Sequence, residues 1–384
     1  MQNLVAVLGL VLICLVESAL TGGNRCSSLT TGVCVSRSQG CPADYIEQAA
    51  YSNYIGCYTL DKICCTLKVS TDSTTTTTTT TTTPTTPSPT PQPQCGTSSS
   101  VVFDRILGGV PTAPCDWPFV VSIRSLLRDQ TNIDLSTTGP ACQGVLVDKR
   151  WVLTSAFCAL AAGGSIEDTS YVDRMLVVAA EYNVSQVDID PSTGQPQEQV
   201  IRVERMILHP DYRFKSQSEF YPFNDAVALN SNNVALIKLA EPINGKCSGV
   251  ICLPTQSEVN NSCQGYDDCV ITGWGFSTEL FEGTPMELLG ARVKLSSRDA
   301  CGFLAERLGL TTVRPVGSLC QSPVFQNTDS CLGDEGGAVM CFNGRSWTVR
   351  ALLPFNLCTN NKYNLFVTDV HPYITWIQNT ISRN

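Results

Sequence analysis

The chain has 384 residues, a formal net charge of −9 at pH 7 and an isoelectric point near 4.8. This length predicts two or three domains, and the acidic balance excludes a basic nucleic-acid-binding surface. The chain has 20 cysteines and two histidines. No paired C-x-x-C set with histidine ligands is present, which argues against a zinc site.

The chain opens on an apolar run at residues 4–16, LVAVLGLVLICLV, which small and polar residues follow. The run is short for a membrane span, so residues 1–22 are predicted to be a signal peptide cleaved between Ser18 and Gly23; a membrane anchor is the alternative. No later stretch is long and apolar enough to span a membrane. The sequence therefore predicts a secreted, extracellular protein whose cysteines form disulfides.

Residues 23–68 form a small cysteine-rich segment. Its six cysteines are Cys26, Cys34, Cys41, Cys57, Cys64 and Cys65. A segment this short cannot bury a large core and is expected to depend on disulfides. Six cysteines permit fifteen pairings, and their spacing alone leaves all of these open.

A Thr/Pro tract at residues 69–94, which contains TTTTTTTTTTPTTPSPTPQPQ, follows the cysteine-rich segment. Such a composition has nothing to bury and predicts an extended, O-glycosylated linker. Fully extended, the tract would reach at most roughly 80–90 Å, so the domains on either side can lie far apart.

Residues 95–384 are predicted to be globular. Short Val-, Ile- and Leu-rich runs such as FVVSI, VALIKL and WTVRALL alternate with Gly, Pro and Asn clusters. The final segment, VHPYITWIQNTISR, has apolar residues at helical spacing. Many short strands and one terminal helix predict an all-β barrel or sandwich that ends in a helix.

Five motifs follow one another in this globular region. They are RILGG at 105–109, WVLTSAFC at 151–158, NNVALIKL at 232–239, CVITGWG at 269–275 and DSCLGDEGG at 329–337. In this order they resemble the trypsin-like serine proteases over residues 105–384, which implies a double six-stranded β-barrel with the site between the barrels. Residues 23–68, which end in the adjacent pair Cys64 and Cys65, resemble the arthropod clip domain. The whole arrangement resembles the clip-domain proteases and protease homologues of arthropod haemolymph.

Peptide hydrolysis by such a domain requires a hydroxyl nucleophile, an imidazole that takes its proton and a carboxylate that holds the imidazole. The resemblance places Phe157 at the histidine position, Asn233 at the aspartate position and Glu335 at the serine position. None of the three can perform the original step, and the Glu335 carboxylate brings negative charge to the place where the transition state develops it. His209 and His371 are predicted to be ordinary turn and cap residues. The sequence therefore predicts a protease fold without catalytic residues.

The primary specificity pocket is also predicted to be blocked. Asp329 occupies the position that selects Arg or Lys substrates in the trypsin-like enzymes. The pocket walls of those enzymes are usually glycines, whereas the resemblance places Phe355 and Leu365 at the walls here. Two large apolar side chains should fill the slot.

The activation device of the family is retained in the sequence. RILGG keeps a cleavable bond between Arg105 and Ile106, and Asp334 stands where the family pairs a carboxylate with the amine that cleavage releases. We expect cleavage after Arg105 and an ion pair between Ile106 and Asp334; the alternative is that these residues are remnants without a role.

The resemblance also implies the disulfides. In the C-terminal domain these are Cys95–Cys252, Cys142–Cys158, Cys269–Cys341, Cys301–Cys320 and Cys331–Cys358, and in the clip-like segment Cys26–Cys64, Cys34–Cys57 and Cys41–Cys65. Pairing Cys115 with Cys247 then leaves Cys263 over. An odd cysteine in a secreted protein indicates an intermolecular bridge or a free thiol.

The segment EYNVSQVDIDPSTGQPQE resembles the calcium loop of trypsin-like domains. Glu181 and Glu198 fall at the positions of its two acidic ligands, and carboxylate oxygens suit calcium. The greater length of the loop and the sequon at Asn183 favour a solvated acidic loop and no cofactor, with a calcium site as the alternative. Asn183 and Asn260 each begin an N-glycosylation sequon.

The sequence as a whole favours a secreted, non-catalytic clip-domain serine protease homologue. The resemblance implies a cofactor or regulator of a haemolymph cascade in innate immunity, with prophenoloxidase activation and melanisation as the expected process. Its partners would be clip-domain proteases, prophenoloxidase or complement-like proteins, and neither nucleic acid nor a membrane. The odd cysteine leaves a disulfide-linked or higher oligomer open. The alternatives are an extracellular adhesion or scaffold protein and an active trypsin-like endopeptidase.

Overall fold

A computed structural model describes residues 33–36, 45–47, 62–67, 95–98, 110–126, 139–163, 169–213, 230–255, 266–275, 286–309, 314–323, 330, 333–355 and 366–384. The chain divides into two compact units, Met1–Gln92 and Pro93–Asn384. This division falls within the predicted Thr/Pro linker, close to its expected end. The predicted signal peptide and the linker itself lie outside the described residues.

The first unit contains a small antiparallel sheet of three strands. Its order is β1 (Val33–Ser36), β3 (Lys62–Leu67) and β2 (Tyr45–Glu47). In the register of the sheet, Cys34 lies opposite Cys64, and Cys65 lies between Val33 and Glu47. The three disulfides predicted for this unit involve side chains outside the described residues, so their pairing stays a prediction.

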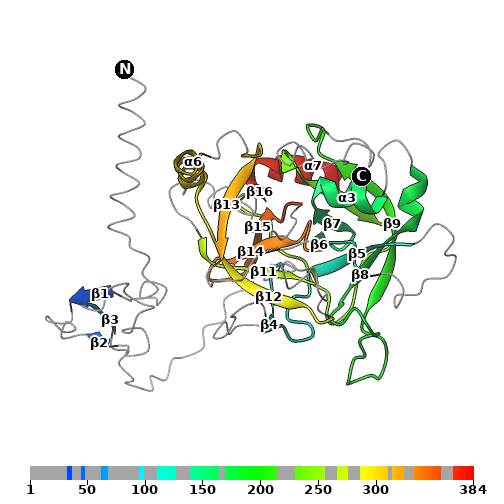
Figure 1. Cartoon of the computed structure of the whole chain (residues 1–384). Helices are drawn as coiled ribbons and strands as arrows, with labels where there is room; N and C mark the ends of the chain where they lie inside the picture. Colours follow the sequence, from blue (N-terminus) through cyan, green and yellow to red (C-terminus); the bar gives the residue numbers. More distant parts are fainter. Residues whose placement is uncertain are drawn as a thin grey trace, which may run out of the picture. The chain divides into compact units, whose positions relative to one another are not determined.

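The second unit begins with a closed β-barrel of six antiparallel strands, in the order β10-β7-β6-β5-β8-β9 (Figure 1). The strands are β5 (Val120–Ser125), β6 (Cys142–Asp148), β7 (Trp151–Thr154), β8 (Met175–Ala179), β9 (Gln199–Leu208) and β10 (Ala235–Leu239). Their β-branched and aliphatic residues suit a pleated, buried surface, and β7 and β8 are buried along their whole length.

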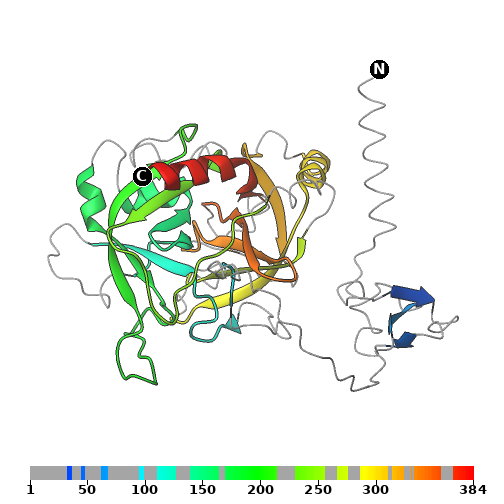
Figure 2. The ribbon, with the colours of Figure 1, turned by 180° about the vertical axis from the view of Figure 1, so that it is seen from behind.

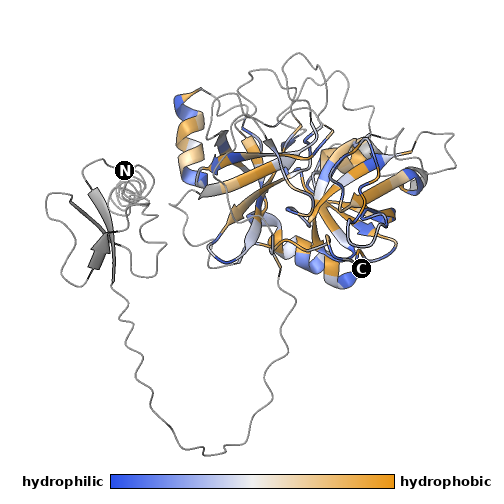
Figure 3. Cartoon of the chain, turned by 90° about the horizontal axis from the view of Figure 1, so that it is seen from below, coloured by the Kyte–Doolittle hydropathy of each residue, from blue (hydrophilic) through white to orange (hydrophobic). Residues whose placement is uncertain are grey.

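A second barrel follows in the order β11-β14-β15-β16-β13-β12, and the pairing of β11 with β12 closes it. The strands are β11 (Tyr266–Gly273), β12 (Leu289–Leu295), β13 (Ser318–Pro323), β14 (Ala338–Phe342), β15 (Trp347–Leu352) and β16 (Phe366–Asp369), and β4 (Val110–Pro111) is added at β12. The predicted double six-stranded barrel is therefore confirmed. Figure 3 shows that the strands of both barrels are mainly hydrophobic.

Helices flank the barrels. They are α3 (Ala156–Gly163), η2 (Thr169–Arg174), α6 (Arg298–Arg307), η6 (His371–Tyr373) and the expected C-terminal helix α7 (Ile374–Arg383). Figure 2 shows α7 lying along the first barrel, where the His209 ring at the end of β9 packs edge-on against Tyr373 and Trp376. None of the helices that the structure describes is long and apolar enough to cross a membrane.

Disulfides join distant parts of the second unit. Those formed between described residues are Cys95–Cys252, Cys115–Cys247, Cys142–Cys158, Cys269–Cys341 and Cys301–Cys320. All of these pairs were predicted. Cys331, Cys358 and Cys263 lie outside the described residues, so the expected Cys331–Cys358 bridge and the state of Cys263 stay predictions.

The Cys95–Cys252 bridge is reinforced by backbone hydrogen bonds around Gly96. The Gly96 N–H donates to Val250 O at 2.7 Å, and the Trp347 N–H donates to Gly96 O at 2.9 Å. Gly96 has φ +68°, and a Cβ there would lie 2.3 Å from Trp347 O, so only glycine fits. The bridge is thus anchored directly against β15.

Candidate functional site

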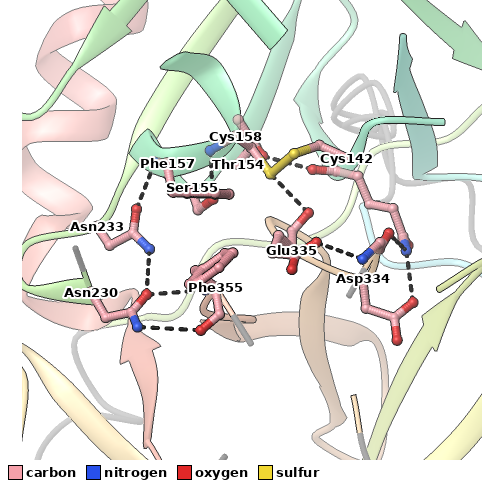
Figure 4. Close-up of a disulfide and its surroundings, with 12 residues drawn as sticks. Cys142, Thr154, Ser155, Phe157, Cys158, Asn230, Asn233, Asp334, Glu335 and Phe355 are labelled. Atoms are coloured by element: carbon pink, nitrogen blue, oxygen red, sulfur yellow. Dashed lines mark hydrogen bonds between the residues drawn. A yellow bond between two sulfur atoms is a disulfide. The ribbon is translucent and has the colours of Figure 1, made fainter. Parts of the chain in front are cut away.

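Phe157, Asn233 and Glu335 come from three distant segments and are brought together where the barrels meet (Figure 4). Phe157 lies in the first turn of α3, Asn233 just before β10 and Glu335 in the turn before β14. The backbone N–H of Phe157 donates to Asn233 Oδ1 at 2.8 Å. The carbonyl oxygen of Glu335 lies 3.0 Å from Cys158 Sγ, next to Phe157. All three predicted site residues are buried.

The Glu335 carboxylate binds a backbone amide of its own turn. Glu335 Oε2 accepts a hydrogen bond of 2.7 Å from the N–H of Gly333, and the Glu335 side chain is almost wholly excluded from water. Gly333 has φ +101°, and a Cβ there would lie 2.9 Å from Gly275 Cα, so this turn requires glycine. The resemblance to the trypsin-like proteases implies that the backbone amides of Gly333 and Glu335 form the oxyanion hole. The Gly333 amide donates here to a carboxylate of the same chain.

Asn230 organises the opposite side of the site, although no motif in the sequence pointed to this residue. Asn230 Oδ1 accepts hydrogen bonds from the Phe355 N–H at 3.0 Å and from Asn233 Nδ2 at 3.1 Å. Its Nδ2 donates to Phe355 O at 3.4 Å. One buried amide side chain thus holds both backbone polar groups of Phe355 and fixes the orientation of Asn233.

The Phe355 ring packs against the Phe157 ring, with centroids 4.6 Å apart. Each residue is 8% exposed. The sequence predicted that Phe355, with Leu365, would fill the specificity pocket; the structure places the Phe355 ring against Phe157, the residue predicted to stand at the histidine position. Asp329 and Leu365, the other predicted pocket residues, lie outside the described part of the chain.

Asp334, the predicted acceptor of the activation amine, is bonded to neutral donors. Its Oδ1 accepts from Gln143 Nε2 at 3.1 Å and from the Gly275 N–H at 2.9 Å. Arg105 and Ile106 lie outside the described residues, so the ion pair between Ile106 and Asp334 stays a prediction. Gln143 was not singled out by its sequence position.

The predicted calcium loop brings three of its carboxylates together, one more than the sequence singled out. Glu181, Asp188 and Glu198 each offer an oxygen, and these oxygens lie within 4.8 Å of one another. Asp188 Oδ2 also accepts from the N–H of Tyr182 at 2.6 Å, and Glu198 Oε1 accepts from the Asp188 N–H at 2.9 Å. These bonds shape the loop around the cluster.

The favoured expectation of a solvated acidic loop is wrong for Glu181, which is buried and ion-paired with the equally buried Arg124. The pKa of Glu181 is raised to about 7, chiefly by burial and also by the carboxylates of Glu198 and Asp188, while Arg124 opposes the change. Glu181 Oε1 has no hydrogen-bond partner among the described residues. A buried, unpartnered carboxylate oxygen in a cluster of like charges fits a calcium ion, which Glu181, Asp188 and Glu198 would hold.

Of the two predicted glycosylation sites, the structure describes Asn183. Asn183 is partly buried, and its Oδ1 accepts from Ser185 N at 3.0 Å and from Ser185 Oγ at 2.6 Å. Asn260 lies outside the described residues, and glycosylation at both positions stays a prediction.

Comparisons with known proteins agree with this architecture. The Trypsin family model matches residues 106–377. The chain is 27% identical to "Ovochymase" of Halocynthia roretzi over 295 residues, which cover 74% of this chain and 16% of that protein. It is 26% identical to "Vitamin K-dependent protein C" of Rattus norvegicus over 286 residues, which cover 73% of this chain and 52% of that protein. The chain thus spans only part of each relative. From the family match and the two closed barrels, it follows that this chain belongs to the Trypsin family.

Proposed function

We propose that this Trypsin-family protein does not hydrolyse peptides and acts instead as a secreted regulator of a proteolytic cascade. The observation that carries the proposal is the hydrogen bond from the Gly333 N–H to Glu335 Oε2. An oxyanion hole works by offering preorganised donors to the charge of a tetrahedral intermediate. Here the Glu335 carboxylate accepts the hydrogen bond of the Gly333 amide. Its negative charge would repel the oxyanion that catalysis must stabilise.

The neighbouring residues support the same conclusion. Phe157 offers a phenyl ring where proton transfer needs an imidazole, and Asn233 offers a neutral amide. The backbone N–H and C=O of Phe355 are bonded to Asn230, which removes them as partners for a peptide strand. Loss of the triad costs on the order of a million-fold in kcat in a protease that uses the same three groups on a different fold.

The regulatory part of the proposal rests on resemblance. The disulfides and the Trypsin fold are typical of secreted proteins, and the cysteine-rich segment at 23–68 resembles a clip domain. We infer a cofactor of an innate immune cascade in haemolymph, with prophenoloxidase activation as the expected process and clip-domain proteases or prophenoloxidase as partners. Cleavage between Arg105 and Ile106, followed by pairing of the new amine with Asp334, would mark the processed form.

The absence of catalysis is tested with protein cleaved after Arg105, the cut being verified by N-terminal sequencing. A fluorophosphonate probe that labels reactive serines should leave the cleaved protein unlabelled, and an arginine anilide substrate should not be hydrolysed. Trypsin at equal concentration is the control. Stoichiometric labelling or turnover above that of the heat-denatured protein would sink the proposal.

The regulatory role is tested by adding cleaved and uncleaved protein to arthropod haemolymph and measuring phenoloxidase activity after an immune elicitor. A dose-dependent change in that activity is expected, with albumin as the control. No change with either form, together with accumulation of the protein in basement membrane, would favour the adhesion alternative instead.

A further inference from the structure

Gln143 is a fully buried residue of β6 whose side chain contacts the turn before β14. Its Nε2 donates to Asp334 Oδ1 and to Gly333 O, each at 3.1 Å. Its backbone N–H donates to Glu335 O at 3.0 Å. One residue of the first barrel thus bonds three consecutive residues of a turn in the second.

The orientation of the Gln143 amide follows from these bonds. Asp334 Oδ1 and Gly333 O are both acceptors, so the NH2 group must face them. The other end of the amide, Oε1, is buried without a hydrogen-bond partner among the described residues. A buried oxygen without a hydrogen bond destabilises the folded chain, so Oε1 does not stabilise this orientation. The two hydrogen bonds from Nε2 to the turn hold the side chain in place.

The Asp334 carboxylate is closely surrounded. Its Oδ1 also accepts from the Gly275 N–H at 2.9 Å. A Cβ at Gly273 would lie 1.9 Å from this oxygen, and one at Gly275 would lie 2.6 Å from it. Gln143 and Gly275 therefore both donate to this carboxylate, and glycine at 273 and 275 is needed because a Cβ at either position would clash with it.

We propose that Gln143 holds the Asp334 turn in its ordered form before cleavage, so that cutting after Arg105 adds an ion pair to a turn already built. A neutral amide that donates to a carboxylate makes a charge-assisted hydrogen bond, which is stronger than a bond between neutral groups. The same turn carries Gly333 and Glu335, so their contact also exists before processing. This inference depends on the contacts of Gln143 and not on the absence of catalysis, and either can fail alone.

Hydrogen exchange measured by mass spectrometry tests the proposal in the full-length protein, before and after cleavage at Arg105. The reporters are the backbone amides of Gly333, Gly336 and Gly337, which donate within the second unit. In the wild type, cleavage should slow their exchange by less than about threefold, because the turn is ordered in both forms. Gln143→Met keeps the length of the side chain and removes its donors; the uncleaved variant should exchange at least about 10-fold faster.

Cleavage should restore slow exchange to Gln143→Met, because the Ile106 amine then supplies a donor to Asp334. Thr154→Val is the matched control, since the Thr154 hydroxyl donates at 2.6 Å to the backbone oxygen of Gln143 and not to its side chain. Exchange of the reporter amides in this variant should follow the wild type. Strong protection of the wild-type turn that arises only on cleavage would overturn the proposal, and this comparison needs no variant. Equal exchange in uncleaved Gln143→Met and wild type would also overturn it.

Discussion

The phenyl rings of Phe157 and Phe355 pack against each other with centroids 4.6 Å apart and planes at 41°. Such a tilted pair stabilises the fold beyond the area that it buries. Phe157 lies in α3, which follows β7 of the first barrel, and Phe355 follows β15 of the second. The contact therefore joins the two barrels at the position proposed to correspond to the family's histidine. The site is therefore filled by packed side chains.

Restoring the three triad residues should not restore full catalysis. The variant Phe157→His, Asn233→Asp, Glu335→Ser regains the chemical groups, but the Phe355 backbone stays bonded to Asn230 and its ring stays over the imidazole. Misplacement of substrate costs about 100-fold or more. We expect kcat/KM for an arginine anilide at least about 100-fold below that of trypsin, and an increase when Phe355→Gly is added. Trypsin-like activity in the triple variant would contradict this prediction.

Removal of the Asn230 side chain should destabilise the second unit. Asn230→Ala strands the Phe355 N–H and Asn233 Nδ2 in a buried region, which costs about 1–3 kcal/mol in the free energy of unfolding. Urea denaturation measures the loss. Asn244→Ala is the control, because the Asn244 side chain is exposed, and its change should stay within about 0.5 kcal/mol. An equal decrease in the free energy of unfolding of the two variants would show that the hydrogen bonds of Asn230 do not stabilise the second unit.

Acidification should destabilise the protein through His209. Burial lowers the pKa of His209, and the Asp211 carboxylate opposes that change. The unfolded chain then binds the proton more readily than the folded one, so the stability from His209 is complete above pH about 6.5 and declines as the pH falls below it.

His209→Phe keeps an aromatic ring against Tyr373 and Trp376 and removes the titration. Its Tm should decline less steeply than that of the wild type between pH 6.5 and about 5. Burial also lowers the pKa of His371, which leaves part of the decline in both proteins. Parallel melting curves over this range would argue against the role of His209.

Calcium should stabilise the second unit through Glu181, Asp188 and Glu198. At a concentration about 100-fold above Kd, a ligand that binds only the folded state adds about 2.7 kcal/mol to the free energy of unfolding. Glu198→Gln should reduce the calcium-induced rise in Tm. Asp190→Asn is the control, because this exposed carboxylate of the same loop accepts from Ser192 and lies outside the cluster. A rise that is equal in wild type and Glu198→Gln would exclude this site.

The barrels were predictable because their strands carry local patterns and because five motifs resemble one family in order. The roles of three buried polar residues were not predictable, because each bonds a residue far away in the sequence; these are Asn230, Gln143 and Arg124. Asn230 bonds a residue 125 positions away, Gln143 one 191 positions away and Arg124 one 57 positions away. No local periodicity records such a pairing, and a buried Gln or Asn looks like any surface amide in the sequence.

The disulfide between Cys95 and Cys252 determines the molar ratio of the two fragments that cleavage would produce. The bridge joins segments 157 residues apart, one on each side of Arg105, so a cut there would leave both fragments in one covalent molecule. The ratio of the N-terminal unit to the Trypsin domain would then stay one to one at any dilution. A partner bound to one unit would meet the other at an effective concentration set by the length and stiffness of the Thr/Pro linker. Dilution would therefore not separate the two fragments. Reduction of the Cys95–Cys252 disulfide would remove this link between them.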